Sequence, residues 1–253
     1  MTSPRHRLRP SLLVLLIATL LLPGCAHKQT RVEVPPPPEP APQSPAPSAG
    51  NTAPGGESSD NTQIKVPAGA KPIFEQTGIA SWYGPPYNHR RGSNGQIYNM
   101  NAMTAAHLTL PLGSIVRVTN LKTGHSALLR ITDRGPFVEG RILDLSLAAA
   151  KALDVYVPGT AKVRLEVLEA PAALNTGGRW AIQIGSFADE HSAAKQADRL
   201  KRRYQTAKVL KFPSPTGNWW VRVRVANDDR LRCQQLVRET EPAEAPVFLV
   251  RLD

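Results

Sequence analysis

The first of two patterned regions alternates apolar and polar residues with a period of two, between residues 77 and 170. Turn residues such as Asn94-Gly95 and Arg134-Gly135-Pro136 separate the alternating segments. This pattern predicts short β-strands. The strands are expected at GIASWYG (78–84), SIVRVTN (114–120), ALLRITD (127–133), RILDLS (141–146) and AKVRLEVLE (161–169).

One helix is expected within this region. Ser146 is a suitable N-cap, and the apolar face that follows it ends near Asp154. Many short strands with a single helix are typical of a small closed barrel. Residues 77–170 are therefore predicted to form a mainly β domain.

The second patterned region covers residues 178–253, after a linker at 171–177. Helical patterns over 189–204 and 228–239 alternate here with strand patterns. The strand patterns are WAIQIGSF (180–187), VLKF (209–212), WWVRVRV (219–225) and VFLVRL (247–252). The order βαββαβ predicts an α+β domain with both helices on one face of the sheet.

Residues 1–24 have the pattern of a secretory signal. Three arginines precede the apolar run Ser11–Leu22, which would rise about 18 Å as a helix and is too short to span a hydrocarbon core of about 30 Å. Leu22-Pro23-Gly24 before Cys25 resembles a bacterial lipobox, which implies cleavage and lipidation at Cys25. An ordinary signal peptide with an incidental cysteine is the alternative. Ala26 after the cysteine resembles lipoproteins sorted to the outer membrane, facing the periplasm.

Residues 25–76 are predicted to be a tether. The chain contains 24 Pro, many of them between Arg31 and Pro54, where an extended polyproline-like conformation is expected. The net charge of +11 is compatible with nucleic acid, lipid or cell wall as a partner. An exported protein does not meet nucleic acid, so we expect the anionic partner in the envelope.

Two cysteines in the chain exclude a disulfide-rich scaffold and a four-cysteine zinc site. If Cys25 is acylated, Cys233 has no intramolecular partner and is expected to be a buried structural thiol. No His or Cys spacing indicates a metal site, and no Gly-x-Ser-x-Gly element or Cys-His arrangement indicates an acyl-transfer nucleophile. We therefore expect neither a metal nor a cofactor.

Carboxylates are sparse in the first domain, which narrows the search for an acid. Asp133 leaves an apolar strand directly into Arg134-Gly135-Pro136, and Asp144 lies between two leucines, where an unpaired charge is costly. A turn residue bonded to nearby amides is the alternative for Asp133, and a structural acceptor ahead of the Ser146 helix is the alternative for Asp144. Solvated surface positions are expected for Asp154, Glu166 and Glu169.

His107 is a further candidate, although a lone histidine is commonly an ordinary hydrogen-bonded side chain. Cleavage of a glycan requires little more than an acid able to protonate the glycosidic oxygen. A carboxylate-bearing domain in the envelope is compatible with that chemistry.

Five motifs in order resemble the rare lipoprotein A family, whose members are lipoproteins with a double-psi β-barrel, often followed by a sporulation-related repeat (SPOR) domain. They are GIASWYG (78–84), NAMTAAHLTLP (101–111), VRVTNL (116–121), DRGPF (133–137) and GRILDLS (140–146). The second region resembles the SPOR domain through WAIQIGSF (180–187) and WVRVRV (220–225).

The resemblance implies endolytic lytic transglycosylase activity on peptidoglycan glycan strands stripped of stem peptides, leaving 1,6-anhydromuramic ends. Asp133 and His107 fall on family positions tied to catalysis, and Asp144 falls where related barrels carry an acid. Tyr83, Gln96 and Arg134 are assigned to substrate binding. Gln96 stands where the family usually has Glu, and Asn99 where it has Asp, so a non-catalytic glycan-binding lipoprotein is the second hypothesis.

The SPOR-like region is expected to bind the same stripped glycan at division septa, where division-site proteins are possible neighbours. The candidate residues lie on strands expected to face away from the helices, with an ordinary core or solvated sheet face as the alternative. They are Gln183, Ser186, Trp219, Trp220, Arg222 and Arg224.

Overall fold

The protein is described from a computed structural model, which places residues 64–67, 69–240 and 245–253. The predicted signal, Cys25 and the predicted tether up to residue 63 lie outside the described residues. No helix in the described part of the chain is long and apolar enough to cross a membrane.

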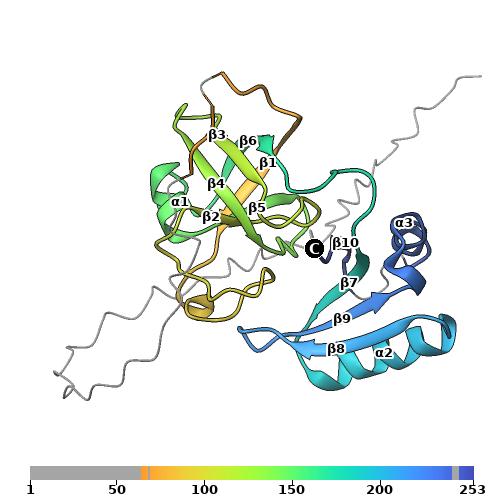
Figure 1. The fold of residues 1–253 in the computed structure, drawn as a ribbon. Helices are drawn as coiled ribbons and strands as arrows, with labels where there is room; N and C mark the ends of the chain where they lie inside the picture. Colours follow the sequence, from red (N-terminus) through yellow and green to blue (C-terminus); the bar gives the residue numbers. More distant parts are fainter. Residues whose placement is uncertain (1–63, 68, 241–244) are drawn as a thin grey trace, which may run out of the picture. The chain divides into compact units, whose positions relative to one another are not determined.

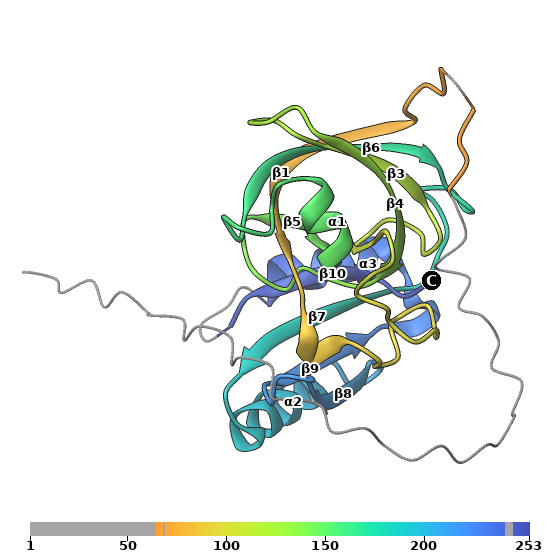
Figure 2. The ribbon, with the colours of Figure 1, turned by 90° about the vertical axis from the view of Figure 1, so that its left-hand side faces the viewer.

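The first domain is a closed six-stranded barrel, which confirms the predicted mainly β class (Figures 1 and 2). Its strands close in the order β1-β5-β2-β4-β3-β6. The pairs β1–β5 and β2–β4 are parallel and the others are antiparallel. The strands are β1 (Phe74–Trp82), β2 (Thr104–Ala106), β3 (Ile115–Asn120), β4 (Ser126–Asp133), β5 (Arg141–Leu145) and β6 (Ala161–Glu169).

Strand β2 was not among the predicted strands. It has three residues, all buried, and a segment this short shows no alternation of apolar and polar positions. It nevertheless pairs with both β4 and β5 in the barrel wall.

The alternation in the strands fills the barrel interior. Leu129 and Ile131 of β4 and Leu143 and Leu145 of β5 are fully buried in one apolar cluster. Helix α1 (Leu147–Ala152) adds Ala149 and Ala150 to this cluster and lies across one end of the barrel in Figure 2. A 3₁₀ turn, η2 (Pro85–Tyr87), follows β1.

Ser146 begins α1 as predicted and also connects it to the β2 region. Its fully buried Oγ accepts the Ala149 N–H at 3.2 Å and donates to the Ala102 carbonyl at 2.7 Å. Ser146→Ala would leave both groups without this partner, so we expect the free energy of unfolding to fall by about 1–3 kcal/mol. Urea denaturation measures the change. Ser126→Ala, on the exposed part of β4, is the control and should cost no more than about 0.5 kcal/mol.

The second domain has the predicted order of strands and helices. The sheet is antiparallel in the order β10-β7-β9-β8 (Figure 1). Buried residues of both helices share one core with the sheet, and Asp189 caps the first helix. The elements are β7 (Trp180–Phe187), α2 (Glu190–Arg203), β8 (Lys208–Pro213), β9 (Trp219–Arg224), η3 (Ala226–Asp228), α3 (Arg230–Glu239) and β10 (Val247–Arg251).

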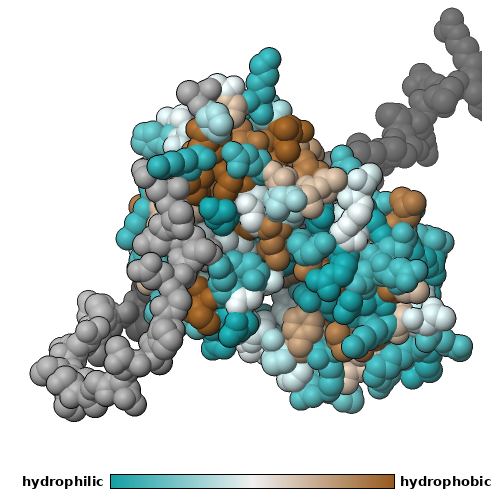
Figure 3. Space-filling model, in the orientation of Figure 1, coloured by the Kyte–Doolittle hydropathy of each residue, from teal (hydrophilic) through white to brown (hydrophobic). Residues whose placement is uncertain are grey.

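Cys233 of α3 is a free, fully buried thiol, as expected. Burial raises its pKa to about 11, which leaves the thiolate scarce and the group unreactive. Figure 3 shows that hydrophilic residues predominate on the visible surface over α2 and β8.

Two expectations about exposure were wrong. Glu166 of β6 is 9% exposed rather than solvated, and it lies 3.6 Å from Arg117 and 3.8 Å from Arg164. Trp219 packs against the core shared with the helices, whereas Trp220 points to the opposite face of β9. Neighbouring residues of a strand face opposite sides, so the two tryptophans cannot share one surface.

Candidate functional site

Three adjacent strands bring the two candidate aspartates to one place. Ala106 of β2 is in register with Asp133 of β4 on one side and with Asp144 of β5 on the other. Neighbouring strands are about 4.8 Å apart, so the two aspartates are separated by a single intervening strand. Leu143 and Leu145 point into the barrel core, and Asp144 between them therefore points out of it.

Both aspartates line a cleft of about 450 Å³. Its barrel side includes Tyr83, whose ring stacks on that of Tyr98 with a centroid separation of 4.5 Å. Its other side comes from the second domain and includes Gln183, Ser186, Trp220, Arg222 and the hairpin between β8 and β9. The cleft is thus lined by both predicted functional regions.

The carboxylate of Asp133 is held in one orientation. Its Oδ1 accepts hydrogen bonds from the Ser93 N–H at 3.0 Å, the Ser93 hydroxyl at 2.5 Å and the Arg134 N–H at 2.8 Å. All the hydrogen bonds that the described residues give to this carboxylate go to Oδ1. Its other oxygen, Oδ2, accepts no hydrogen bond from the described residues.

Asp144 is the more deeply buried acid. Desolvation raises its pKa to about 6, the Asp133 charge adds to the rise, and Arg141 opposes it. The Arg141 guanidinium lies 3.4 Å from Oδ2, while the buried Oδ1 has no hydrogen-bond partner among the described residues. Among the described residues, the Asp144 carboxyl thus accepts no backbone hydrogen bond ahead of α1. With a pKa of about 6, Asp144 carries a proton in mildly acidic solution.

His107 lies beside this site without lining it. Its Nδ1 accepts the N–H groups of Thr109 and Leu110, both at 3.1 Å, and its Nε2 lies 3.1 Å from the Gln76 side-chain oxygen. These contacts fit a neutral ring with the proton on Nε2, and burial lowers the pKa of His107 to about 3. Its backbone N–H donates to the Asp133 carbonyl at 3.1 Å, so it supports the strand end that carries the acid.

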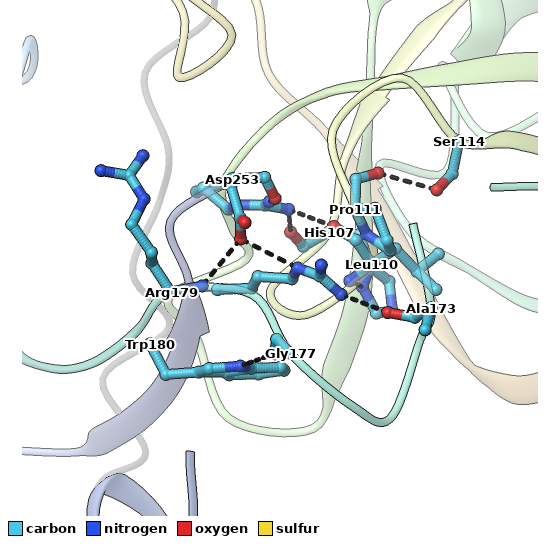
Figure 4. Close-up of polar contacts among 11 residues, drawn as sticks. His107, Leu110, Pro111, Ser114, Ala173, Gly177, Arg179, Trp180 and Asp253 are labelled. Atoms are coloured by element: carbon cyan, nitrogen blue, oxygen red, sulfur yellow. Dashed lines mark hydrogen bonds and ion pairs between the residues drawn. The ribbon is translucent and has the colours of Figure 1, made fainter. Parts of the chain in front are cut away.

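Arg134 has its guanidinium turned into the protein, toward His107, Leu110 and Asp253, which are labelled in Figure 4. It donates to the main-chain oxygens of these residues at 3.0, 2.6 and 2.5 Å respectively. Desolvation is the main cause that lowers the pKa of Arg134 to about 10, where it remains charged at neutral pH. The predicted substrate-binding arginine thus joins the barrel to the end of the second domain.

Gln96 does not line the cleft of the two aspartates. It lines a separate depression together with Asn94, Arg130 and Thr132, and its side-chain oxygen accepts the Asn94 amide at 2.9 Å. The cleft thus holds Asp133 and Asp144 without Gln96.

The candidates of the second domain divide between two surfaces. Gln183 accepts two hydrogen bonds from Arg222, at 3.1 and 2.5 Å, and both residues line the cleft with Ser186 and Trp220. Arg224 instead forms an ion pair with Asp228, 2.5 Å away, at a different depression.

Sequence reasoning missed several residues of the cleft, among them Ser93, Phe137 and Arg141. The pairing of Arg141 with Asp144 gave no signal, because residues three apart in a predicted strand are expected on opposite faces. Ser93 gave no signal, since its partner Asp133 is 40 positions away. In the described part of the chain, no group of three His, Cys, Asp or Glu residues could hold a metal ion.

Comparison with known proteins identifies both domains. A double-psi β-barrel family model described as "Lytic transglycolase" matches residues 75–165, and the SPOR domain model matches residues 176–237. The two models thus match the barrel and most of the second domain. The barrel is accordingly of the double-psi type and the second domain is a SPOR domain, as the motifs implied.

Among the relatives is "Endolytic peptidoglycan transglycosylase RlpA" of Campylobacter jejuni, 38% identical over 164 residues, which are 55% of this chain and 60% of the relative. The protein of the same description from Neisseria meningitidis serogroup B is 49% identical over 135 residues, 52% of this chain and 56% of the relative. The chain thus spans little more than half the length of these curated relatives. A solved expansin of Clavibacter michiganensis is 15% identical with a TM-score of 0.33, covering 70% of this chain and 96% of that one.

Proposed function

We propose that this protein is an endolytic peptidoglycan transglycosylase that cleaves glycan strands lacking stem peptides. The observation that carries the proposal is the pair Asp133 and Asp144, which flank Ala106 and line one cleft of a barrel matching the lytic transglycolase model. The two relatives described above are named as endolytic peptidoglycan transglycosylases.

Asp144 is proposed to be the general acid. A buried carboxyl with a pKa of about 6 holds a proton that an ordinary aspartate has lost. Transfer of this proton to the glycosidic oxygen breaks the bond between that oxygen and C1 of the muramic sugar. Positive charge then develops at C1, as in other glycosidic cleavages.

Asp133 is proposed to be the base that completes the reaction. The 6-hydroxyl oxygen of the same sugar attacks C1, and its proton passes to Asp133 Oδ2, which forms the 1,6-anhydro ring without water. Three hydrogen bonds to Oδ1 fix the carboxylate while it receives the proton. Afterwards Asp133 must lose a proton and Asp144 regain one, so proton exchange with solvent or between the two carboxyl groups closes the cycle.

His107 is proposed to act through position rather than by touching substrate. Its neutral ring fixes the turn before Leu110, and its N–H holds the main chain at Asp133. In the SPOR domain, Trp220, Arg222, Gln183 and Ser186 are proposed to bind the glycan.

The direct test is digestion of purified, stem-free glycan strands followed by mass spectrometry. The proposal expects fragments that end in 1,6-anhydromuramic acid, with internal cleavage shown by intermediate lengths. Reducing muramic ends would instead indicate hydrolysis and would contradict the proposed chemistry.

A glycan-binding lipoprotein without catalysis is the second candidate, favoured by Gln96 in place of the family's Glu. Binding of stem-free strands without any anhydro product would support it over the enzyme. Gln96→Glu then tests the reason, because restored cleavage would show that the missing carboxylate belonged to the reaction.

The chain is further proposed to be anchored through Cys25 in the outer membrane, facing the periplasm and enriched at the division septum. Thioether lipidation requires sulfur, so Cys25→Ser should abolish incorporation of a radiolabelled fatty acid and shift the protein out of the membrane fraction. Cys233→Ser is the matched control and should retain the label. Unchanged labelling of Cys25→Ser would exclude the anchor.

A further inference from the structure

The cleft around Asp133 and Asp144 carries more positive than negative charge. Five arginines line it against two aspartates, and no lysine takes part: Arg90, Arg91, Arg134, Arg141 and Arg222. A neutral sugar chain does not require such a surplus of guanidinium groups. The charge indicates that the ligand brings an anion into the cleft.

Three of these arginines are engaged by the main chain. Arg90 donates to the Pro86 carbonyl and Arg91 to the Gly95 carbonyl, and both residues are exposed. Arg134 donates to three main-chain oxygens from a buried position. Arg141 and Arg222 are the remaining two, and their guanidinium groups have no main-chain partner among the described residues.

Arg141 has a weak counter-charge. Its only ion pair among the described residues is with Asp144, at 3.4 Å, and its buried Nε has no partner there. When Asp144 holds its proton, as it does below its pKa of about 6, Arg141 faces a neutral carboxyl and its charge is uncompensated. A partly buried guanidinium in this state gains from any anion that reaches it.

Arg222 is held in place by neutral groups. It donates from Nε and Nη2 to Gln183 and lies over the Phe212 ring, 5.0 Å from its centroid. Neither partner removes its charge. Gln183 and Phe212 instead pre-orient the planar guanidinium, which reduces the entropy lost when an anion binds.

Aromatic contacts bring the two arginines to the same cleft. Phe137, in the segment between β4 and β5 that leads to Arg141, lies 5.0 Å from Trp220 and 5.8 Å from Phe248 between ring centroids. Trp220 shares a face of β9 with Arg222. The barrel and the SPOR sheet therefore each present one arginine to a ligand in the cleft.

We infer that Arg141 and Arg222 bind the free lactyl carboxylate of muramic acid, and that this contact selects strands without stem peptides. The inference rests on the proposed function. In an intact strand the lactyl carboxyl is amide-bonded to the stem, so it has no charge and is followed by a peptide. Removing the stem leaves a carboxylate, which guanidinium groups bind with two parallel hydrogen bonds.

The test measures binding rather than cleavage, so that it remains informative if the protein is not an enzyme. The full chain carrying Asp133→Asn is titrated with stem-free glycan and with the same glycan after its lactyl carboxylates are converted to methylamides. We expect the methylamide strands to bind at least about 10-fold more weakly, the effect of one charge-assisted contact. Equal affinity for the two strands would overturn the inference.

Arginine variants assign the effect to the proposed pair. In the same background, Arg141→Gln and Arg222→Gln should each weaken binding of the carboxylate strands and leave binding of the methylamide strands unchanged. Arg238→Gln on α3, outside the cleft, is the matched control and should alter neither. If a variant weakens binding of the carboxylate strands and of the methylamide strands by the same factor, the arginine supports the fold or binds sugar, and carboxylate recognition is rejected.

The outcomes separate this inference from the proposed function. Absence of anhydro products from the wild type, together with a large carboxylate preference, would reject the enzyme and retain the arginine pair. Anhydro products without a preference for strands that carry the carboxylate would support the enzyme and reject the role of the arginine pair.

Discussion

Asp133→Asn is expected to reduce the formation of 1,6-anhydromuramic products by about 10²–10⁴, the usual effect of losing one acid or base. The amide keeps the shape of the side chain and an oxygen that can accept from Ser93 and the Arg134 N–H. It cannot take up the proton of the 6-hydroxyl. Chromatography of digests of stem-free glycan measures the loss.

Two comparisons guard this result against a folding defect. Asp198→Asn, an exposed α2 residue paired with Lys201, should cleave at the wild-type rate. The thermal unfolding midpoint of Asp133→Asn should stay close to that of the wild type. A cleavage rate within about threefold of the wild type would remove Asp133 from the reaction.

Asp144→Asn is expected to reduce cleavage by a similar factor, about 10²–10⁴, and to change its pH dependence. The wild-type kcat/KM should decline above pH 6, because burial raises the pKa of Asp144 to about 6 and only its protonated form can donate. The residual activity of Asp144→Asn should lack this decline. Rates on stem-free glycan between pH 4.5 and 8 measure both.

The pH dependence of folding stability tests the raised pKa of Asp144 independently of activity. The folded state binds the Asp144 proton more tightly than the unfolded state does, since the pKa rises from 3.8 to about 6 on folding. The contribution of Asp144 to stability is therefore fully present below pH 3.8 and falls, by up to about 3 kcal/mol, as the pH rises toward 6.

Asp144→Asn should lose less stability than the wild type over this pH range, as urea denaturation would show. Glu139→Gln, an exposed residue of the preceding segment, is the control and should behave as the wild type. Identical pH profiles for Asp144→Asn and the wild type, in both activity and stability, would contradict the assignment of Asp144 as the buried acid.

The local part of the fold could be predicted because its signals are local. Ser146 as an N-cap and the alternation in β3 to β6 depend on residues a few positions apart. The motifs also identified the barrel and SPOR families. The three-residue strand β2 escaped because Thr104–Ala106 is too short to show a period, although it is the strand that lies between the two aspartates.

The residues of the site were predicted less well than its elements. Trp219 and Trp220 are adjacent residues of the same type, so the sequence does not distinguish them. Only the packing of β9 shows that Trp219 contacts the core and that Trp220 lines the cleft. His107 lies in one of the family's motifs and Gln96 stands where the family has Glu, yet packing turns the His107 ring toward Gln76 and places Gln96 in another depression. Side-chain direction depends on neighbours that are distant in the sequence.

The sequence by itself determined the two folded domains, their families and the scarcity of carboxylates from which Asp133 and Asp144 emerged as candidates. The tertiary structure decided that these two carboxyl groups face one cleft, because β2 pairs with β4 on one edge and β5 on the other. It also decided their electrostatics. Desolvation raises the pKa of Asp144, and Arg222 reaches the cleft from a strand 81 positions beyond Arg141 in the chain. Burial and long-range contact are properties of the packed chain, which no local pattern of residues encodes.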